Sequence, residues 1–418
     1  MMGDTTAAML LPDDIILEIL LRVSTDSATL FRCAATSKRW RALIADRPFL
    51  QSCWTANARH PSLRLGFLIQ QQCNKEDINS PYPPLFVPPL GSVLGARPRL
   101  LTHILSCVPD GLLDGAKPLA ERHGLLVVRL FRGVFGNSVR IAVCDLRVGA
   151  CNVLPHLACE ASFITCTIVT GEDCPSLQGK RALSSGCYSA FFKVLALVVS
   201  GHKRDANEEC NLYTFSSAEP TWGVPTKCFE KMSGICRGGF SLLQWKYDNA
   251  LVRRGVAHWL AWCLSEVGAS PKYYSLDVSA ETGLVSLTEI SVPFYQLPDN
   301  SSMLPMLSVA ADRSLAMFCP RKEFGIWYID MWTRGNDTDS GVWLRTKSVK
   351  LNVEIRPYAR MWREEKGGTL LIVDDSWVVR WVDIENLRME VEHFPGGIGL
   401  EAMPMHVDWP ALFLSLLG

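Results

Sequence analysis

The chain of 418 residues carries no net formal charge, because its 42 Lys and Arg residues balance its 42 Asp and Glu residues. This balance excludes a global electrostatic attraction to nucleic acid or to anionic lipid, so we expect neither nucleic acid nor a membrane among the partners. Apolar residues make up 48% of the chain and charged residues 20%, which is typical of a folded protein with a large core. The length allows two or more domains.

Cysteine usage indicates a reducing compartment. The 15 cysteines are scattered along the chain and no two lie three positions apart, so neither a zinc ribbon nor a thioredoxin-like site is predicted. The first apolar segment lacks the basic start of a secretory signal and contains Asp13, Asp14 and Glu18. We therefore expect a cytoplasmic or nuclear protein whose cysteines are small core residues, without a metal or a cofactor.

The spacing of apolar residues within 10–58 predicts three short helices. The first begins with Pro12, which needs no hydrogen-bond donor there, and with two acidic residues that suit the positive end of the helix dipole. The second follows residues 24–27, and the third begins near Ser37 and ends at Pro48. So much apolar surface in three short helices requires a cover, supplied either by the rest of the chain or by another protein.

Beyond a proline-rich stretch at 80–98, short runs of β-branched and aromatic residues predict strands. Ten runs qualify: 124–130, 139–146, 191–199, 210–215, 256–264, 273–278, 314–319, 324–332, 369–374 and 378–384. They recur as a unit that starts near residues 124, 191, 256, 314 and 369. This recurrence favours the four-stranded blades of a β-propeller over the alternative, a pair of β-sandwiches. Closure of the ring predicts that a strand within 85–105 joins the blade formed by residues 369–395.

A search for catalytic and metal-binding motifs finds none, since the HExxH, GxSxG, P-loop and GxGxxG patterns are absent. Residues 336–341 faintly resemble a calcium loop, but Lys347 stands where a glutamate is required. His258 is interpreted as a packed or hydrogen-bonded strand residue, and most tryptophans on the strands as core residues. The chain is therefore expected not to be an enzyme.

The N-terminal segment resembles the F-box, through its Leu11–Pro12 start, its apolar helical face and the SKRWRALI segment. The resemblance implies that the Skp adaptor of a cullin-RING ubiquitin ligase covers this face, in a helix-in-groove contact. The residues that it places in the adaptor contact are Leu11, Pro12, Ile15, Ile19, Leu20, Leu30, Cys33, Ser37, Trp40 and Leu43.

The rest of the chain is similar to plant F-box proteins, above all those of grasses, that carry a β-propeller-like associated domain. Phrases such as VCDLRVGACNVLP (143–155) and HVDWPALFLSLLG (406–418) carry this similarity. It implies a small all-α F-box module at 1–60, a linker at 61–84 and a large all-β propeller at 85–418. The apolar run after Asp408 and Pro410 also predicts a short helix packed on the domain.

The family implies a substrate receptor without catalytic residues. Its F-box ties it to the adaptor, and through the adaptor to the cullin and RING subunits, while its propeller holds a target protein of unknown identity. The first alternative is an adaptor-bound scaffold or ligand-binding propeller whose target is not ubiquitinated. The second is a propeller enzyme such as a glycosidase, because a fold does not dictate its chemistry.

Overall fold

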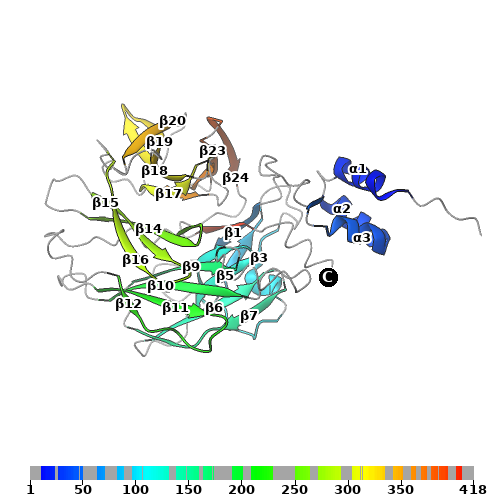
Figure 1. Cartoon of the computed structure of the whole chain (residues 1–418), viewed down its shortest axis with the longest axis horizontal. Coiled ribbons are helices and arrows are strands. Elements are labelled where there is room, and N and C mark those ends of the chain that lie inside the picture. The colour runs from blue at the N-terminus through cyan, green and yellow to red at the C-terminus, as the bar shows by residue number, and fades with distance from the viewer. Residues whose placement is uncertain are drawn as a thin grey trace, which may run out of the picture.

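Figure 1 shows a computed structural model of the chain, in which helices α1–α3 lie to one side of a large body of β-sheets. The residues that the structure describes are 11–23, 27–46, 48–49, 64–70, 82–88, 97–105, 107–130, 138–146, 148–159, 163–171, 173, 191–200, 209–228, 250–263, 272–292, 304–310, 312, 314–334, 342–351, 359–363, 369–373, 378–384, 386–393 and 402–406.

The three predicted helices are confirmed, as α1 (Asp13–Val23), α2 (Ser27–Thr36) and α3 (Lys38–Ile44). The carbonyl of Pro12 accepts the first hydrogen bond of α1, from the backbone N–H of Ile16 at 3.1 Å. Ser37 caps α3, because its side chain accepts a hydrogen bond from the backbone N–H of Trp40 at 3.1 Å. Both helix starts therefore follow from capping chemistry that the sequence displays.

The strands form six sheets, which we number as blades 1–6. In order across the sheet, blade 1 consists of β25 (Ala402–His406), β1 (Arg64–Ile69), β2 (Leu85–Val87) and β3 (Arg99–Leu100). Blade 2 consists of β4 (Lys117–Arg122), β5 (Leu125–Leu130), β6 (Ser138–Asp145) and β7 (Ala150–Val153). Blade 3 consists of β9 (Phe163–Thr170), β10 (Phe192–Ser200), β11 (Glu209–Ser216) and β12 (Thr226–Lys227). Blade 4 consists of β13 (Leu251–Arg253), β14 (Val256–Cys263), β15 (Lys272–Ser279) and β16 (Val285–Ile290). Blade 5 consists of β17 (Met306–Val309), β18 (Leu315–Glu323), β19 (Ile326–Arg334) and β20 (Trp343–Leu351). Blade 6 consists of β21 (Arg360–Arg363), β22 (Thr369–Val373), β23 (Val378–Asp383) and β24 (Arg388–His393). Strand β8 (Leu157–Ala158) also pairs with β6, and the short helix α5 (Leu101–Ile104) follows β3.

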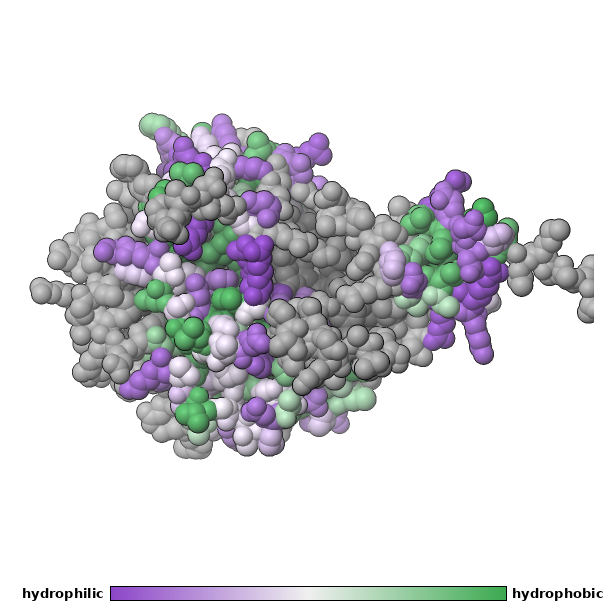
Figure 2. Space-filling model, viewed as in Figure 1, coloured by the Kyte–Doolittle hydropathy of each residue, from purple (hydrophilic) through white to green (hydrophobic). Residues whose placement is uncertain are grey.

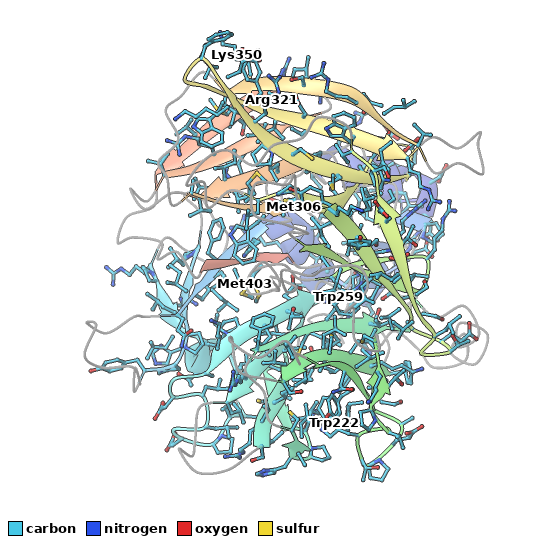
Figure 3. The ribbon with its side chains drawn as sticks, turned by 90° about the vertical axis from the view of Figure 1, so that its left-hand side faces the viewer. Trp222, Trp259, Met306, Arg321, Lys350 and Met403 are labelled. Atoms are coloured by element: carbon cyan, nitrogen blue, oxygen red, sulfur yellow. The ribbon has the colours of Figure 1, made fainter. Side chains whose placement is uncertain are left out.

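The six blades form a closed ring, because each blade shares a buried apolar cluster with the next. Examples, taken around the ring from blades 1 and 2 to blades 6 and 1, are Leu68 with Leu126, Val127 with Ile168, Leu195 with Trp259, Leu260 with Met317, Phe318 with Ile372, and Trp381 with Phe67. In Figure 3 the blades follow one another around a centre near Met306 and Met403, whereas Lys350 lies at the outer edge. The propeller expectation is confirmed, and the sandwich alternative is wrong.

All ten predicted strands are present, and they are the second and third strands of blades 2–6. First strands of neighbouring blades contact one another, as β25 contacts β4 and β4 contacts β9. The first strands therefore line the centre of the ring, and the fourth strands form its outer edge. The exposure of the side chains agrees with this placement of the fourth strands at the outer edge. The fourth strand β16 is mostly exposed or half-buried, whereas the second strand β10 is mostly buried.

Ring closure differs from the prediction. The strand at Leu85–Val87 does not join the sheet of residues 369–395, whose strands form blade 6 together with β21. Instead β25 pairs antiparallel with β1, for example Leu68 opposite Met403, and β1 pairs with β2. Blades 1 and 6 are neighbours, because Phe67 and Val87 pack with Leu371 and Trp381. Strand β1 also lies within the segment 61–84 that was expected to be a linker, so the propeller begins earlier in the chain.

The expectation of core cysteines holds in part. Of nine cysteines that are free thiols in the described part of the chain, Cys144, Cys166, Cys210 and Cys319 are buried, four others are half-buried and Cys107 is exposed. Burial raises the pKa of the Cys166 and Cys319 thiols, so these side chains remain neutral in the core. The predicted helix after Asp408 lies outside the described residues.

Gly66 provides a test of the closing strand. It lies at the bulge of β1 with a φ of +144°, and an added Cβ would stand 2.2 Å from the carbonyl oxygen of Val87. We expect Gly66→Ala to lower the free energy of unfolding by about 3 kcal/mol or more, because both backbone strain and overlap with β2 result. At Gly325, where φ is +80° and nothing lies within 4 Å of an added Cβ, the same change adds only the strain, about 1–2 kcal/mol. Urea unfolding of both variants measures the difference, and equal losses would contradict the close approach of β1 and β2.

Candidate functional site

The helices α1–α3 enclose an apolar core of their own. Its buried members are Ile16, Leu20, Leu30, Ala34, Ile44 and Phe49. The half-buried residues packed against it are Leu17, Val23, Cys33, Trp40 and Leu43. No strand residue belongs to this cluster within the described part of the chain. The helical module is therefore a separate structural unit, and its core does not depend on the propeller.

A stripe of apolar side chains remains uncovered on this module. Leu11, Ile15 and Ile19 are 49%, 45% and 37% exposed. They are spaced four residues apart, so they lie along one side of α1 and of the turn that precedes it. We call these three residues the α1 stripe. Figure 2 shows hydrophobic residues at the surface of the module beside hydrophilic ones. The ion pair of Glu18 and Arg22, at 3.1 Å, lies next to the stripe on the exposed side of the helix.

The ten residues that were expected to contact the adaptor fall into two groups. Leu11, Pro12, Ile15 and Ile19 are exposed. The others support the module: Leu20 and Leu30 are fully buried, Ser37 caps α3, and Cys33, Trp40 and Leu43 are half-buried against the core. The structure thus brings all ten residues into one module, and Ser37 is exposed as well as Leu11, Pro12, Ile15 and Ile19.

Sequence analysis missed Arg39, which connects α3 to the start of α1. Its Nε donates to Oδ1 of Asp13 at 2.8 Å, and its Nη2 donates to the backbone carbonyl oxygen of Leu11 at 2.6 Å. Arg39 thereby fixes the backbone that carries the first residue of the α1 stripe. The interacting residues are 26 and 28 positions apart. In the sequence, Arg39 is visible only as a cationic residue next to Trp40, and nothing there indicates that it bonds to Asp13 and Leu11.

Outside the helical module, the described residues offer few candidates for a catalytic or metal-binding site. The Nδ1 atom of His258 lies 2.7 Å from Oδ1 of Asp277 on the neighbouring strand, so His258 is a hydrogen-bonded strand residue, as interpreted from the sequence. The described residues contain no cluster of three His, Cys, Asp or Glu side chains suited to a metal ion. They also contain no helix that is long and apolar enough to cross a membrane.

Comparison with known proteins identifies the helical module. The family model of the F-box domain matches residues 9–52. A putative F-box protein of Arabidopsis thaliana is 47% identical over 53 residues, which is 13% of this chain and 14% of that protein. The match thus spans only a small part of the plant relative. Residues 9–52 form an F-box domain, and a large six-bladed all-β domain follows it.

The solved structures that are similar to parts of this chain are distant. An α-L-arabinanase of Penicillium chrysogenum is 8% identical, with a TM-score of 0.37, and the match covers 65% of this chain and 78% of the arabinanase. An α-L-arabinofuranosidase of Fusarium graminearum is 10% identical, with a TM-score of 0.37 and coverage of 70% and 82%. A putative 6-phosphogluconolactonase of Bacteroides fragilis is 8% identical, with a TM-score of 0.35 and coverage of 84% and 97%.

The division between core and surface residues of α1 can be tested with two adjacent positions. Leu20→Ala opens a cavity in the core of the module, so we expect a loss of about 2–5 kcal/mol in the stability of the helices. Ile19→Ala removes a side chain that lies outside the buried core, at 37% exposure, and is expected to cost under about 1 kcal/mol. Amide hydrogen exchange of α1–α3 in the full-length chain measures both effects. Similar exchange in the two variants would mean that the module packs in a different helical phase.

Proposed function

We propose that the F-box domain docks onto an Skp adaptor through the α1 stripe, and that the chain is a substrate receptor of an SCF-type ubiquitin ligase. The observation that carries this proposal is an uncovered apolar stripe on a helical module that already has a complete core. The cost of leaving large side chains such as Ile15 in water is removed when a partner covers them, at about 25 cal/mol for each Å² buried. An amphipathic helix laid against an apolar groove is a recurring way to do so.

The six-bladed domain is proposed to hold the target protein. The chain contributes no catalytic group in this scheme. It contributes proximity, since it holds a target lysine near the conjugating enzyme that the cullin and RING subunits recruit, and transfer then becomes effectively intramolecular. We further infer that the whole chain belongs to the plant F-box proteins with an associated propeller, a group prominent in grasses, and that it acts in the cytoplasm or the nucleus.

Adaptor affinity tests the proposal directly. Ile15→Ala combined with Ile19→Ala removes most of the α1 stripe without touching the buried side of the helix. Truncating anchors at the centre of an interface commonly costs about 2 kcal/mol or more, so affinity for a purified Skp adaptor should fall by roughly thirtyfold. Replacing Leu11 and Pro12 with alanine should weaken binding in the same way. Isothermal titration calorimetry with the full-length chain gives these values.

Leu21→Ala is the matched control for this measurement. Leu21 is 38% exposed and Ile19 is 37% exposed, but two residues of helix rotate the side chain by about 200°, to the opposite flank. The control variant should bind the adaptor as the wild type does. Full affinity in the Ile15 and Ile19 variant would refute docking through the stripe.

Deletion of residues 1–60 tests the independence of the two parts. Every described strand lies beyond this deletion, since β1 begins at Arg64, and the helical core contains only residues from Ile16 to Phe49. We expect a folded propeller whose thermal transition barely moves and which no longer binds the adaptor. Circular dichroism and adaptor pull-down provide the measurements. Unfolding of the β domain would instead indicate that the helices stabilise the propeller.

A further inference from the structure

The outer edge of blade 5 is unlike the outer edges of the other blades. Its fourth strand, β20, has nine residues, whereas the fourth strands of the other blades have two to six. It pairs with β19 from Trp343 opposite Arg334 to Leu351 opposite Trp327, with one register shift between Met331 and Trp332. On its other side, no strand in the described part of the chain pairs with it. An edge of this length presents a row of backbone N–H and C=O groups to which another extended chain can bind.

Positive charge is concentrated on this edge. Among the nine residues of β20, Arg345, Lys347 and Lys350 are cationic and none is acidic, although the chain as a whole has no net charge. Arg345 and Lys350 are exposed. Figure 2 shows hydrophilic side chains at the top of the view, where Figure 1 places β19 and β20. In Figure 3, Lys350 and Arg321 lie at the outer end of the same blade.

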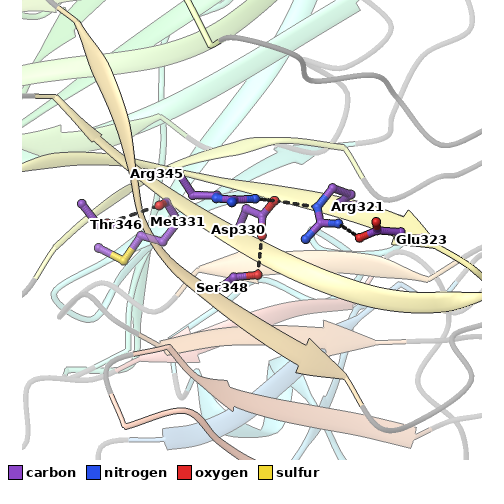
Figure 4. Close-up of polar contacts among 7 residues, drawn as sticks. All are labelled: Arg321, Glu323, Asp330, Met331, Arg345, Thr346 and Ser348. Carbon is purple, nitrogen blue, oxygen red and sulfur yellow. Dashed lines mark hydrogen bonds and ion pairs between the residues drawn. The ribbon is translucent and has the colours of Figure 1, made fainter.

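A buried carboxylate, that of Asp330, connects this edge to the neighbouring strand and pairs with one of its cations, Arg345 (Figure 4). Asp330 of β19 is 3% exposed, and its carboxylate accepts hydrogen bonds from Nε of Arg321 at 2.8 Å and from Oγ of Ser348 at 2.5 Å. The hydrogen bond with Asp330 raises the pKa of Arg321, whose guanidinium also stacks over the ring of Tyr328 at 4.5 Å. Arg345 lies farther from Asp330, at 3.7 Å, with 52% of its side chain exposed. Arg321 and, at the longer distance, Arg345 compensate the buried charge of Asp330, and Arg321 also pairs with Glu323. The side chains of Arg345 and Lys350 remain exposed.

Three occupants of such an edge have different chemical requirements. A second copy of the same edge would place lysine and arginine against lysine and arginine, and cationic edges oppose such self-pairing. A nucleic acid offers phosphates to the cations but no row of amide donors and acceptors for the backbone. An extended acidic polypeptide satisfies both the charges and the backbone groups.

We infer that β20 is a docking site for an extended acidic segment of a partner protein, which adds to blade 5 as a fifth strand. Backbone hydrogen bonds hold the segment, and its carboxylates face Arg345 and Lys350. The exposed side chain of Leu344, at 57%, offers an apolar contact at one end of the strand. One part of this inference rests on the proposed receptor function: that the bound partner is the target protein of the ligase. In that case the targets are proteins with an acidic segment in extended conformation. Peptide binding itself does not require the adaptor.

The test measures fluorescence anisotropy of labelled nine-residue peptides with the full-length chain, in the absence of adaptor. The probes are a peptide of alternating Glu and Val, its Lys and Val counterpart, an acidic peptide with proline at alternate positions, and a single-stranded DNA oligonucleotide. We expect binding of the first peptide alone, because proline removes the donors that strand addition needs. Binding should weaken as salt is raised, since exposed charges are screened. It should also slow hydrogen exchange in β20.

Charge reversal on the chain completes the test. Arg345→Glu combined with Lys350→Glu should weaken acidic-peptide binding by roughly tenfold or more, as expected for two exposed ion pairs that turn repulsive. The matched control is Lys227→Glu combined with Arg388→Glu, which makes the same charge change on the exposed fourth strands of blades 3 and 6 and should leave binding unchanged.

Several outcomes would overturn the inference: no binding of the acidic peptide, equal binding by the proline peptide, equal losses in the two double variants, or preferential binding of DNA. Adaptor affinity is measured separately through the α1 stripe. Failure at β20 with intact adaptor binding would therefore leave the receptor proposal in place and remove only this docking site. Loss of adaptor binding with intact peptide binding would do the reverse.

Discussion

The pairing of β1 with β25 is the interaction on which the ring of blades depends. Blade 1 is the one blade assembled from two distant parts of the chain, since β1–β3 lie before residue 101 and β25 lies after residue 401. It contributes to two of the inter-blade cores, with blade 2 through Leu68 and Met403 and with blade 6 through Phe67. Loss of the pairing would thus weaken both cores and leave an unpaired sheet edge.

The ring of blades and the helical module each have their own buried cores, and the proposed function follows from this separation. The helices bury Leu20, Leu30 and Ile44 among themselves and leave the α1 stripe uncovered. The propeller completes its cores blade against blade. A change on β20 or on any outer strand therefore need not disturb the surface proposed for the adaptor. A receptor built in this way can alter its target while it keeps its ligase.

The strands that were predictable from the sequence share a physical property. The second and third strands of blades 2–6 are covered on both faces by neighbouring blades, so strands such as β10 appear as continuous apolar runs. The fourth strands are short or exposed, and the two residues of β12 carry no such signal. Blade 1 was not predicted as a unit because β2 and β3 have only three and two residues, and because its four strands never form one local unit in the sequence. Its closing pair is set by tertiary contacts alone, which explains why closure was placed on the wrong sheet.

The sequence predicts which segment carries the candidate docking surface, but not which of its side chains form that surface. Ile19 and Leu20 are equally apolar in the sequence, and the positions of α2 and α3 decide which of them is buried. Arg39 illustrates the same limit, since its bonds to Asp13 and to the carbonyl of Leu11 join residues of different helices. Composition and periodicity identify elements, whereas the phase of a helix and the partner of a cation depend on the assembled module.

The long sequence separation between β1 and β25 has a consequence for synthesis in the cell. The ribosome makes β25 about 330 residues after β1, so at about 5–20 residues per second the first blade waits tens of seconds for its partner strand. Throughout that interval the nascent propeller exposes the edge of β1, a target for chaperones or for premature association. The F-box domain is complete long before, because all of its core residues precede position 50. A nascent chain can therefore present the finished surface proposed for the adaptor while its propeller is still being built.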